Sequence, residues 1–465
     1  MKFRSLMSLR RSDDPSRAGR MRMADCTRSS RRGPVHWLSV VPILIACGGS
    51  SGSGQPLDAP VAGPAVKLTV TDRGAARAGV HVYFLDAAGA LVAAVDTGAD
   101  GVASAVVAAG GSVTALDAFA PRNATAHALF TYEGVKPGDQ LVLARSDRTT
   151  AAFTLSAPTV TGATAYDVFT TCGAGSLAAD SSGTRATGTV NLGGCGGAAD
   201  IAVLARQNST PVSGLFHAAA VVPGTGSLEL TDAYVAPTEV SFTYTNAPAG
   251  VTLDVQHAPR LDHGRLGPFR LSVLGGAGTL QEPVVAAASS VVLTSFEVAA
   301  GGQEVVEWGP SSPTYTLDLP SVLLPEFPSR PAYDPATARV TWSEAARGVT
   351  PDATITLIQT SRSSGARQWD WFVIAPYTPN ELGLPRGATE LADWLPTAGD
   401  TIYIDHVSTV KLTGGYDALR ARTIDLAASD LSLAAGPSGR FVTSSSAGSA
   451  RGNATLRRSV FGFER

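Results

Sequence analysis

The sequence predicts an all-β protein made of tandem β-sandwich modules. Apolar and polar residues alternate in 66–71 (VKLTVT) and 80–84 (VHVYF), and each run stops at a Gly or Asp turn signal. Comparable runs recur about every 8 to 12 residues between Gly and Pro, which is the spacing typical of β-sandwiches. Amphipathic helical patterns are few, and we expect a short helix over 390–395.

The N-terminal segment has the three parts of a secretory signal peptide, and we assign residues 1–46 to it. Arginines within 28–32 precede the apolar run 37–46 (WLSVVPILIA), which ends in a small residue before Cys47. The run is too short for a membrane-spanning helix, which needs about 20 residues. The segment is long for a signal, so we expect an over-long start. A start at one of the two methionines in 21–23 would give an ordinary length.

Residues 44–47 (LIAC) resemble the lipobox of bacterial lipoproteins. The resemblance implies that the Cys47 thiol receives a diacylglyceryl group, that the chain is cut before Cys47, and that the new amino terminus is acylated. Two or three acyl chains would anchor the protein stably, because each buried methylene contributes about 0.8 kcal/mol. Gly48 stands where Asp favours inner-membrane retention, so the resemblance favours the outer membrane of the cell envelope. Residues 47–64, rich in Gly, Ser and Pro, are then a lipidated flexible tether.

The charge of the chain after residue 46 argues against one class of partner. The whole chain has 36 basic and 39 acidic residues, and residues 1–46 carry ten of the basic and three of the acidic ones. The remainder has 26 basic and 36 acidic residues, which gives a formal charge near −10. Proteins that bind nucleic acid present basic patches, so we expect no nucleic-acid partner.

The four cysteines indicate one disulfide in the exported part. Cys26 falls within the signal segment and Cys47 is the predicted lipidation site, which leaves Cys172 and Cys195. Two cysteines in an oxidising compartment are expected to pair. In the chain-entropy model, closing such a loop contributes roughly 3 kcal/mol to stability. The alternative is a metal pair, but no Cys or His lies at ligand spacing beside either cysteine.

The first module after the tether has four features in a fixed order. They are a strand ending near Asp72 and Gly74, the step AGV at 78–80, the turn from Asp96 to Asp100 and Gly101, and AGG at 109–111. With these features, residues 66–116 resemble a carboxypeptidase-regulatory-like or bacterial Ig-like module. The resemblance implies a small Greek-key sandwich without catalytic activity, of a kind that serves as a stalk or adaptor.

A weak internal repeat aligns 130–143 (FTYEGVKPGDQLVL) with 242–255 (FTYTNAPAGVTLDV) without gaps. The copies share Phe, Thr, Tyr, Gly and Leu at an offset of 112 residues. A strand, a Pro/Gly turn and a returning strand would make each copy a β-hairpin. The alternative is that Gly-rich composition alone produces the likeness.

The length after the tether suggests two to four domains. Residues 166–203, which include Cys172 and Cys195, resemble uncharacterised lipoproteins of myxobacteria, and this resemblance implies no activity. Pro-rich residues 320–335 look like a link between modules. The expected units are the carboxypeptidase-regulatory-like/Ig-like sandwich 65–150, a second β module 151–258 with the disulfide, a β-rich segment and Pro-rich link 259–335, and a C-terminal β module 336–465.

Motifs that name a reaction or a metal are missing from the sequence. Residues 48–52 (GGSSG) match the nucleophile-elbow pattern, but they lie in the tether, without the strand and helix that the elbow requires. No P-loop, HExxH or spaced CxxC pair occurs. Asp96 and Asp100 lack the alternate oxygen ligands of a calcium loop, so a β-turn accounts for them better.

Two groups of polar residues could form catalytic or metal sites. His257 and His263 lie near two aspartates, but their spacing fits no ligand set, and we expect a surface loop there. Asp405, His406 and Ser408 could outline a triad. Adjacent residues of a strand point to opposite faces, however, so Asp405 and His406 cannot cooperate without a bend.

Trp369 and Trp371 are the candidate glycan-binding residues. On a strand they share one face, where two exposed indoles could stack on sugar rings. The alternative is a core strand covered on both faces, which the apolar run 372–375 (FVIA) favours.

Together these patterns predict a lipid-anchored cell-envelope lipoprotein with a non-catalytic structural or binding role. We expect no cofactor and no metal, and the partners would be the membrane, through Cys47, and an envelope protein or a glycan. One alternative is a surface carbohydrate-binding or adhesive protein that uses Trp369 and Trp371. Another is an envelope hydrolase whose site is assembled from residues far apart in the sequence.

Overall fold

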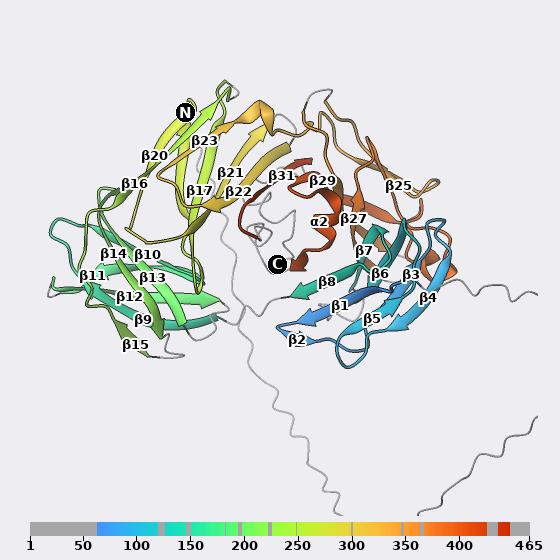
Figure 1. The fold of residues 1–465 in the computed structure, drawn as a ribbon, viewed down its shortest axis with the longest axis horizontal. Helices are drawn as coiled ribbons and strands as arrows, with labels where there is room; N and C mark the ends of the chain where they lie inside the picture. Colours follow the sequence, from blue (N-terminus) through green and yellow to red (C-terminus); the bar gives the residue numbers. More distant parts are fainter. Residues whose placement is uncertain are drawn as a thin grey trace, which may run out of the picture. The chain divides into compact units, whose positions relative to one another are not determined.

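The computed structural model describes residues 63–119, 126–145, 150–181, 183–193, 198–221, 226–247, 249–298, 301–345, 348–362, 367–425 and 436–446. It is about 60% strand and 4% helix, so the predicted all-β class is confirmed (Figure 1). The predicted signal segment and Cys47 lie outside the described residues.

The longest sheet has 13 strands. In spatial order they are β18 (Gly264–Arg265), β17 (Thr252–Leu261), β21 (Ser289–Val298), β22 (Gly301–Pro310), β31 (Gly439–Ser446), β29 (Thr401–Leu412), β26 (Ala353–Arg362), β27 (Arg367–Pro376), β7 (Ala126–Val135), β6 (Gly111–Leu116), β3 (His81–Leu85) and β4 (Leu91–Asp96), with β19 (Phe269–Leu274) also paired to β17. The sheet therefore joins strands from the beginning, middle and end of the described chain.

Four smaller sheets and three short helices complete the described fold. A five-stranded sheet contains β2 (Ala75–Ala76), β1 (Val66–Asp72), β8 (Gln140–Arg145) and β30 (Thr423–Asp425), with β5 (Val102–Ala105) paired to β1. A seven-stranded sheet contains β14 (Thr210–Val221), β13 (Ala198–Gln207), β10 (Ala165–Thr170), β11 (Gly173–Ala179), β12 (Arg185–Gly193), β9 (Thr150–Pro158) and β15 (Ser227–Glu229). Two three-stranded sheets contain β20 (Ala277–Glu282), β16 (Thr238–Thr245) and β23 (Thr314–Asp318), and β24 (Ala332–Asp334), β25 (Arg339–Thr341) and β28 (Glu381–Gly383). The helices are α1 (Thr389–Ala392), α2 (Gly415–Arg420) and the 3₁₀ helix η1 (Leu319–Ser321).

The first and last expected modules share one hydrophobic core. A single cluster of buried side chains contains Val66, Phe130 and Phe441, which come from both ends of the described chain. In addition, β7 pairs in parallel with β27, and β8 pairs in parallel with β30. The described parts of 65–150 and 336–465 therefore share a core and pair with each other, although the sequence pattern suggested two separate units. Alternation predicts where strands lie, but it does not say which strands pair.

Both copies of the internal repeat have the same local structure, which is an arch between two sheets. β7 lies in the 13-stranded sheet and β8 in the five-stranded sheet, and β16 and β17 likewise belong to different sheets. The turn residues Gly138 and Gly250 both have positive φ, 86° and 77°, a conformation that glycine adopts without strain. The hairpin prediction is wrong because apolar residues on both sides of each turn are buried in a core between the sheets.

Hydrogen bonds hold the Pro-rich segment 320–335 against the 13-stranded sheet. Gln303 of β22 donates from Nε2 to the Leu324 carbonyl (2.9 Å) and accepts the Leu324 N–H at Oε1 (3.1 Å). Ser444 of β31 donates to the Pro325 carbonyl (2.8 Å). Leu324 lies outside any strand, so no neighbouring strand bonds its backbone N–H and carbonyl. The side-chain amide of Gln303 bonds both groups instead, and buried backbone groups need such partners.

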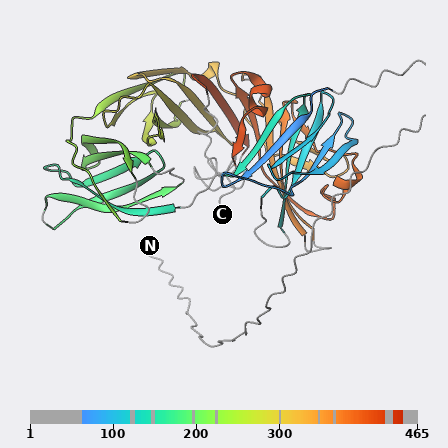
Figure 2. The same cartoon turned by 60° about the horizontal axis from the view of Figure 1, so that its bottom comes forward.

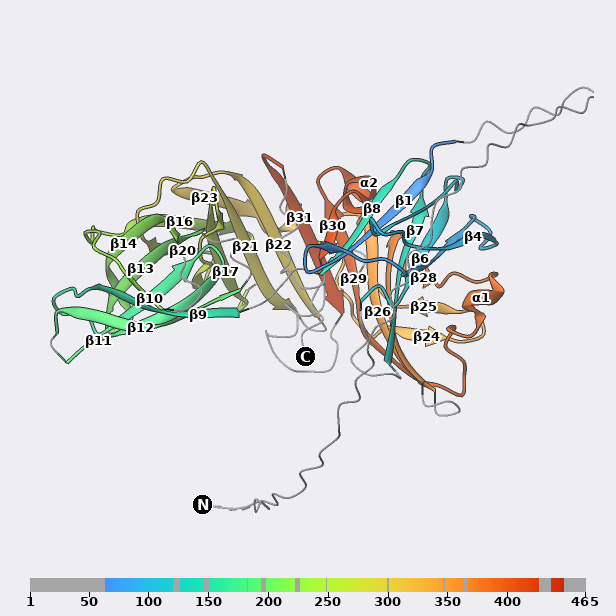
Figure 3. The ribbon, with the colours of Figure 1, turned by 90° about the horizontal axis from the view of Figure 1, so that it is seen from below.

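The seven-stranded sheet has a core of its own, which includes Phe153, Leu155, Tyr166 and Val203. Figures 1 and 3 both show β9, β12, β11, β10 and β13 side by side, in the spatial order that their hydrogen bonds define. The helix expected over 390–395 overlaps α1 only at 390–392, because the helix ends at Ala392.

Candidate functional site

A buried hydrogen-bonded network joins two sheets around His257. His257 Nδ1 lies 2.8 Å from Glu282 Oε2, and His257 Nε2 lies 3.3 Å from the Tyr315 hydroxyl. The same hydroxyl lies 2.5 Å from Ser290 Oγ. His257 and Ser290 belong to β17 and β21 of the 13-stranded sheet, whereas Glu282 and Tyr315 belong to β20 and β23 of a three-stranded sheet. The network therefore links two facing layers.

His257 lies in a strand, so the surface loop expected there is wrong. The ring is 3% exposed and continues the inward alternation of Leu253 and Val255 in β17. His263 lies in the turn after β17, and its Nδ1 is 3.4 Å from Asp200 Oδ1 in the seven-stranded sheet. The two histidines thus serve different contacts rather than one site.

The order carboxylate, imidazole, hydroxyl is the order found in nucleophilic hydrolases. In this protein the hydroxyl beside His257 is that of Tyr315, which also accepts the Ser312 N–H (3.2 Å). Glu282, His257 and Ser290 are each at most 5% exposed. A substrate would reach them only if the two sheets separated. The arrangement is therefore best suited to a polar cross-link between layers, in which each buried group keeps a partner.

Histidine pairing is general in the described part of the chain. Each of the six histidines there has Nδ1 within 3.4 Å of a carboxylate oxygen. The pairs are His81–Asp96, His127–Asp117, His217–Asp232, His257–Glu282, His263–Asp200 and His406–Asp405. A carboxylate on Nδ1 fixes the orientation of the ring. Because the pairs are spread over several sheets, they do not converge on one centre.

Asp405 and His406 do contact each other, contrary to the expectation from strand geometry. Asp405 Oδ2 lies 3.0 Å from His406 Nδ1. The reason is a bulge: the partners of β26 step from His406 to Ile404 and leave Asp405 without an opposite residue. Ser408 completes no triad in the described part, because its Oγ lies 2.6 Å from Ser445 Oγ.

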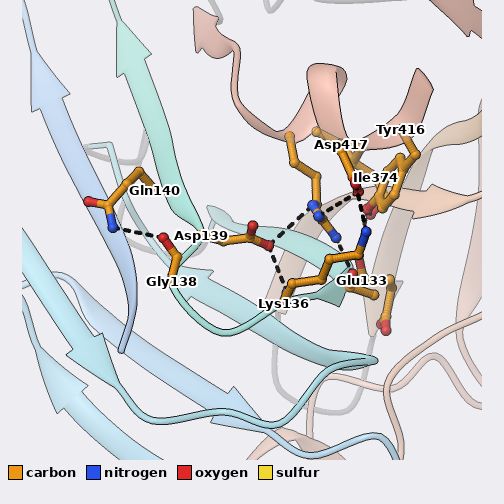
Figure 4. Close-up of polar contacts among 10 residues, drawn as sticks. Glu133, Lys136, Gly138, Asp139, Gln140, Ile374, Tyr416 and Asp417 are labelled. Atoms are coloured by element: carbon orange, nitrogen blue, oxygen red, sulfur yellow. Dashed lines mark hydrogen bonds and ion pairs between the residues drawn. The ribbon is translucent and has the colours of Figure 1, made fainter. Parts of the chain in front are cut away.

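A second polar cluster joins α2 to the arch between β7 and β8. We call it the clasp and define it by Glu133, Lys136, Asp139, Tyr416, Asp417 and Arg420. Figure 4 shows that the Tyr416 and Asp417 side chains, from α2, meet the residues of the arch. The clasp holds residues that are about 280 positions apart in the sequence.

Arg420 is the centre of the clasp and is 2% exposed. Its Nη1 donates to the Gly134 carbonyl, its Nη2 donates to Asp417 Oδ1 (2.8 Å), and its Nε lies 3.2 Å from Asp139 Oδ2. The guanidinium also lies 5.0 Å from the centre of the Tyr416 ring, within cation–π range. Each contact is therefore made by a charge that water does not reach.

Two further contacts close the clasp. The Tyr416 hydroxyl lies 2.5 Å from the Glu133 carbonyl oxygen and 3.2 Å from that of Ile374. Lys136 Nζ lies 2.6 Å from Asp417 Oδ2, with both side chains more than half exposed. Figure 4 draws these interactions as dashed lines. The Lys136 pair is solvated, so we expect it to contribute much less than Arg420.

The carboxyl group of Glu133 is unusual within the clasp. Its Oε1 is buried and has no hydrogen-bond partner among the described residues. Burial raises the pKa of Glu133 to about 7, because a desolvated carboxyl disfavours its charged form. Asp417 behaves in the opposite way: the hydrogen bond from Lys136 lowers its pKa.

We expect Glu133→Gln to stabilise the protein at pH 8 relative to the wild type. The folded-state pKa of Glu133 lies above its ordinary value of 4.5, so its contribution is fully present below pH 4.5 and is lost as the pH rises to about 7. Between pH 4.5 and 7 the free energy of unfolding of the wild type therefore falls by about 2 to 3 kcal/mol because of Glu133. Urea unfolding from pH 4 to 8 measures it as the difference between wild type and variant.

Asp417→Asn is the control for the pH dependence of Glu133, because the pKa of Asp417 is lowered by folding whereas that of Glu133 is raised. The lowered pKa of Asp417 means that its contribution is present above its ordinary pKa of 3.8 and is lost as the pH falls below that value. The variant should therefore leave the slope between pH 5 and 8 unchanged. If Glu133→Gln also left that slope unchanged, the buried carboxyl would not titrate in this range.

Trp369 and Trp371 lie in the core, so the glycan-binding hypothesis that depends on their exposure is wrong. Trp369 is 1% exposed and Trp371 is fully buried. Both lie in the cluster that also contains Val373 and Trp394. Trp371 Nε1 donates to Thr131 Oγ1 (2.9 Å). The alternative of a core strand with both faces covered is confirmed, since Trp371 and Val373 lie in one buried cluster and Phe372 and Ile374 lie in another.

Cys172 lies at the turn between β10 and β11, and Cys195 lies outside the described residues. The ladder between β11 and β12 places Gly173 opposite Leu192. The disulfide between Cys172 and Cys195 stays a prediction.

Within the described ranges, no group of three or more His, Cys, Asp or Glu side chains is placed to hold a metal ion. No helix in the same ranges is both long and apolar enough to cross a membrane. The turn expected after Asp96 is present: the Gly101 N–H donates to the Gly98 carbonyl (2.9 Å), and Asp100 Oδ1 accepts the Val102 N–H (3.1 Å).

Comparison with known proteins provides no family. No family model matches the chain, and no curated protein matches it. Among solved structures, the Bacillus anthracis TIE protein is similar at 11% identity and a TM-score of 0.14, over 55% of this chain and 49% of that one. The native conformation of E. coli alpha-2-macroglobulin is similar at 14% identity and a TM-score of 0.10, over 73% and 26%. The chain thus spans half or less of each matched protein, and neither TM-score supports an argument.

Proposed function

We propose that this protein is a lipid-anchored cell-envelope protein whose β-rich part has a non-catalytic structural or binding role. The observation that carries the proposal is the LIAC sequence at 44–47, followed by a segment rich in Gly, Ser and Pro. The first described strand, β1, begins at Val66, 19 residues after Cys47. Gly48, in place of Asp, favours the outer membrane.

The use of titratable side chains supports a structural role. The network of His257 joins two sheets, and the clasp joins residues about 280 positions apart in the sequence. In both clusters the polar side chains bond to other residues of the same chain. These groups hold the β-rich part together, and we infer that its partner, an envelope protein or a glycan, binds elsewhere on the surface.

We expect Cys47→Ala to release the protein from membranes. Lipidation requires the thiol, and an anchor of two or three acyl chains is what holds a protein without a spanning helix. The full-length gene and the variant would be expressed in a bacterial host with lipoprotein processing, followed by membrane fractionation and mass measurement of the mature amino terminus. Wild type in membranes with an acylated residue 47, and the variant in the soluble fraction, would support the proposal. An unmodified wild type in the soluble fraction would refute it.

A further inference from the structure

A hairpin at one edge of the 13-stranded sheet places two arginines side by side. A two-residue turn joins β17 to β18, and their register sets Arg260 directly opposite Arg265. Side chains directly opposite on antiparallel strands share one face, with Cβ atoms about 4.5 to 5.5 Å apart. Figures 1 and 3 label β17 beside β21, and in Figure 2 these olive strands lie between the green seven-stranded sheet and the red strand β31. Among the described strands, β18 pairs with β17 alone, so its outer edge is open.

Arg265 has no anionic partner in the described part of the chain. Its guanidinium makes no hydrogen bond and no ion pair there. The side chain is partly buried, and this burial, together with the charge of Arg260, lowers the pKa of Arg265 to about 10. Arg260 Nη1 lies 3.4 Å from the carbonyl oxygen of Gly436, which is an uncharged acceptor. Like charges directly opposite destabilise a pair of strands, and a desolvated charge without a partner adds to that cost.

Arginines elsewhere in the β-rich part have a carboxylate partner of their own. These pairs are Arg145–Asp72, Arg185–Glu229, Arg206–Asp167, Arg339–Glu381, Arg362–Asp400 and Arg440–Glu307. In Arg362–Asp400 two guanidinium nitrogens donate to the two carboxylate oxygens, at 2.8 and 2.7 Å, which is the fork geometry that arginine adopts with oxyanions. Asp262, in the turn between the two strands, is exposed and forms no ion pair with Arg260 or Arg265 in the described structure. The two forks of the hairpin are therefore without an acid from the described chain.

The hairpin is held in place by the seven-stranded sheet. His263 Nδ1, in the turn, lies 3.4 Å from Asp200 Oδ1 of β13. A Cβ added at Gly264 would lie 3.3 Å from the carbonyl oxygen of Thr171, so the turn packs closely against the end of β10. The backbone under the two arginines is thus fixed before any ligand arrives, and such preorganisation lowers the entropic cost of binding.

We propose that Arg260 and Arg265 form a binding site for a phosphate group, either free or carried as a monoester on a lipid headgroup. Two adjacent guanidinium groups supply two positive charges, and a phosphate monoester carries about 1.5 to 2 negative charges at pH 7. Its oxygens can accept from both forks at once, whereas a carboxylate neutralises only one charge. The chain has more acidic than basic residues, so this pair is a local exception that its overall charge does not explain. The site does not depend on the lipid anchor.

The test uses the full chain with Cys47→Ala, so that binding is measured without acyl chains. Isothermal titration calorimetry with inorganic phosphate, at constant ionic strength, compares this chain with Arg260→Gln and Arg265→Gln. We expect each variant to bind phosphate at least about tenfold more weakly, because one of two charged forks is lost. The matched control is Arg73→Gln, which removes the same charge from the exposed turn after β1 and should leave binding unchanged. Arg265→Lys keeps the charge without the fork, and its weaker binding tests the site if glutamine disturbs the hairpin.

Vesicles distinguish the two sources of the phosphate group. Phosphatidylcholine vesicles that contain phosphatidic acid present a monoester, and vesicles of equal surface charge that contain phosphatidylglycerol present only a diester. Binding to inorganic phosphate alone assigns a free phosphate, and binding to phosphatidic acid vesicles alone assigns a lipid headgroup. Binding to both assigns the phosphate group itself.

Four results would overturn the proposal. The unsubstituted site could bind neither inorganic phosphate nor phosphatidic acid, or the variants at Arg260 and Arg265 could bind as tightly as it does. Arg73→Gln could weaken binding as much as they do, which would leave net charge as the cause. Equal binding to phosphatidylglycerol vesicles would show that the pair responds to surface charge and not to a phosphate monoester.

Discussion

Replacing Arg420 with alanine is expected to lower the free energy of unfolding by about 3 kcal/mol. The guanidinium is 2% exposed and contacts the Gly134 carbonyl, Asp417 and Asp139. Alanine would leave the Gly134 carbonyl without this donor and Asp139 without this cation, whereas Asp417 would keep its pair with Lys136. Breaking a buried charged contact costs about 3 to 5 kcal/mol, and the partial exposure of both carboxylates places this case at the lower end. Urea denaturation at pH 7 measures the loss.

Lys136→Ala is the matched control for Arg420→Ala. It removes another cation from Asp417, but this pair is more than half exposed, so the expected cost is below about 1 kcal/mol. Hydrogen exchange should also become faster in α2 of the Arg420 variant, because the clasp joins this helix to the arch between β7 and β8. Equal losses of stability in the two variants would show that buried Arg420 contributes no more to the free energy of unfolding than exposed Lys136 does.

Trp371→Ala is expected to lower the free energy of unfolding by about 4 kcal/mol. The side chain is fully buried, and its Nε1 donates to Thr131 Oγ1 (2.9 Å). Removing a buried tryptophan costs about 3 to 5 kcal/mol, since apolar contacts are lost and a cavity remains. Thermal or urea unfolding of the full chain measures the change.

Trp371→Phe and Leu274→Ala are the controls for Trp371→Ala. Phenylalanine keeps most of the apolar contact and loses the hydrogen bond, for an expected cost of about 1 to 2 kcal/mol. Leu274 is 72% exposed, and its truncation should change stability by less than about 0.5 kcal/mol. If Trp371→Ala kept full stability and abolished binding to a glycan, the core assignment of this residue would fail.

The strands were predictable because alternation is a local property of the sequence. The runs at 66–71 and 80–84 become β1 and β3 nearly residue for residue, and the core position of Trp371 follows from the apolar run after it. The short helix near 390 was predictable for the same reason.

The pairing of strands was not predictable, because it depends on contacts between distant residues. The repeat at 130–143 and 242–255 was visible in the sequence, and its turn glycines keep the same conformation in both copies. Whether a turn makes a hairpin or an arch depends on where the two strands find partners. Here one partner of each strand, β27 for β7 and β30 for β8, comes from residues beyond 360, and nothing near the turn records it.

The polar clusters were missed for a related reason. The sequence predicts a surface loop at His257 because the spacing of its polar neighbours fits no ligand set, whereas His257 lies on the inward face of β17. Glu133 had a signal that was overlooked: it is a carboxylate within a strand, at the position where the second copy of the repeat has Thr245. Arg420 has no such signal, since its partners outside α2, Gly134 and Asp139, lie about 280 residues earlier in the chain.

The place of β31 also fixes an order of folding. One edge of β22 is covered by β31, and residues 311–438 must be made before that strand exists. At ordinary rates of synthesis this takes on the order of ten seconds. An unpaired strand edge is a template for aggregation during that time. The incomplete chain is thus the form of this protein that most needs a chaperone. A stop codon shortly before residue 439 would leave the edge of β22 unpaired and would therefore promote aggregation, although it removes only the last described strand.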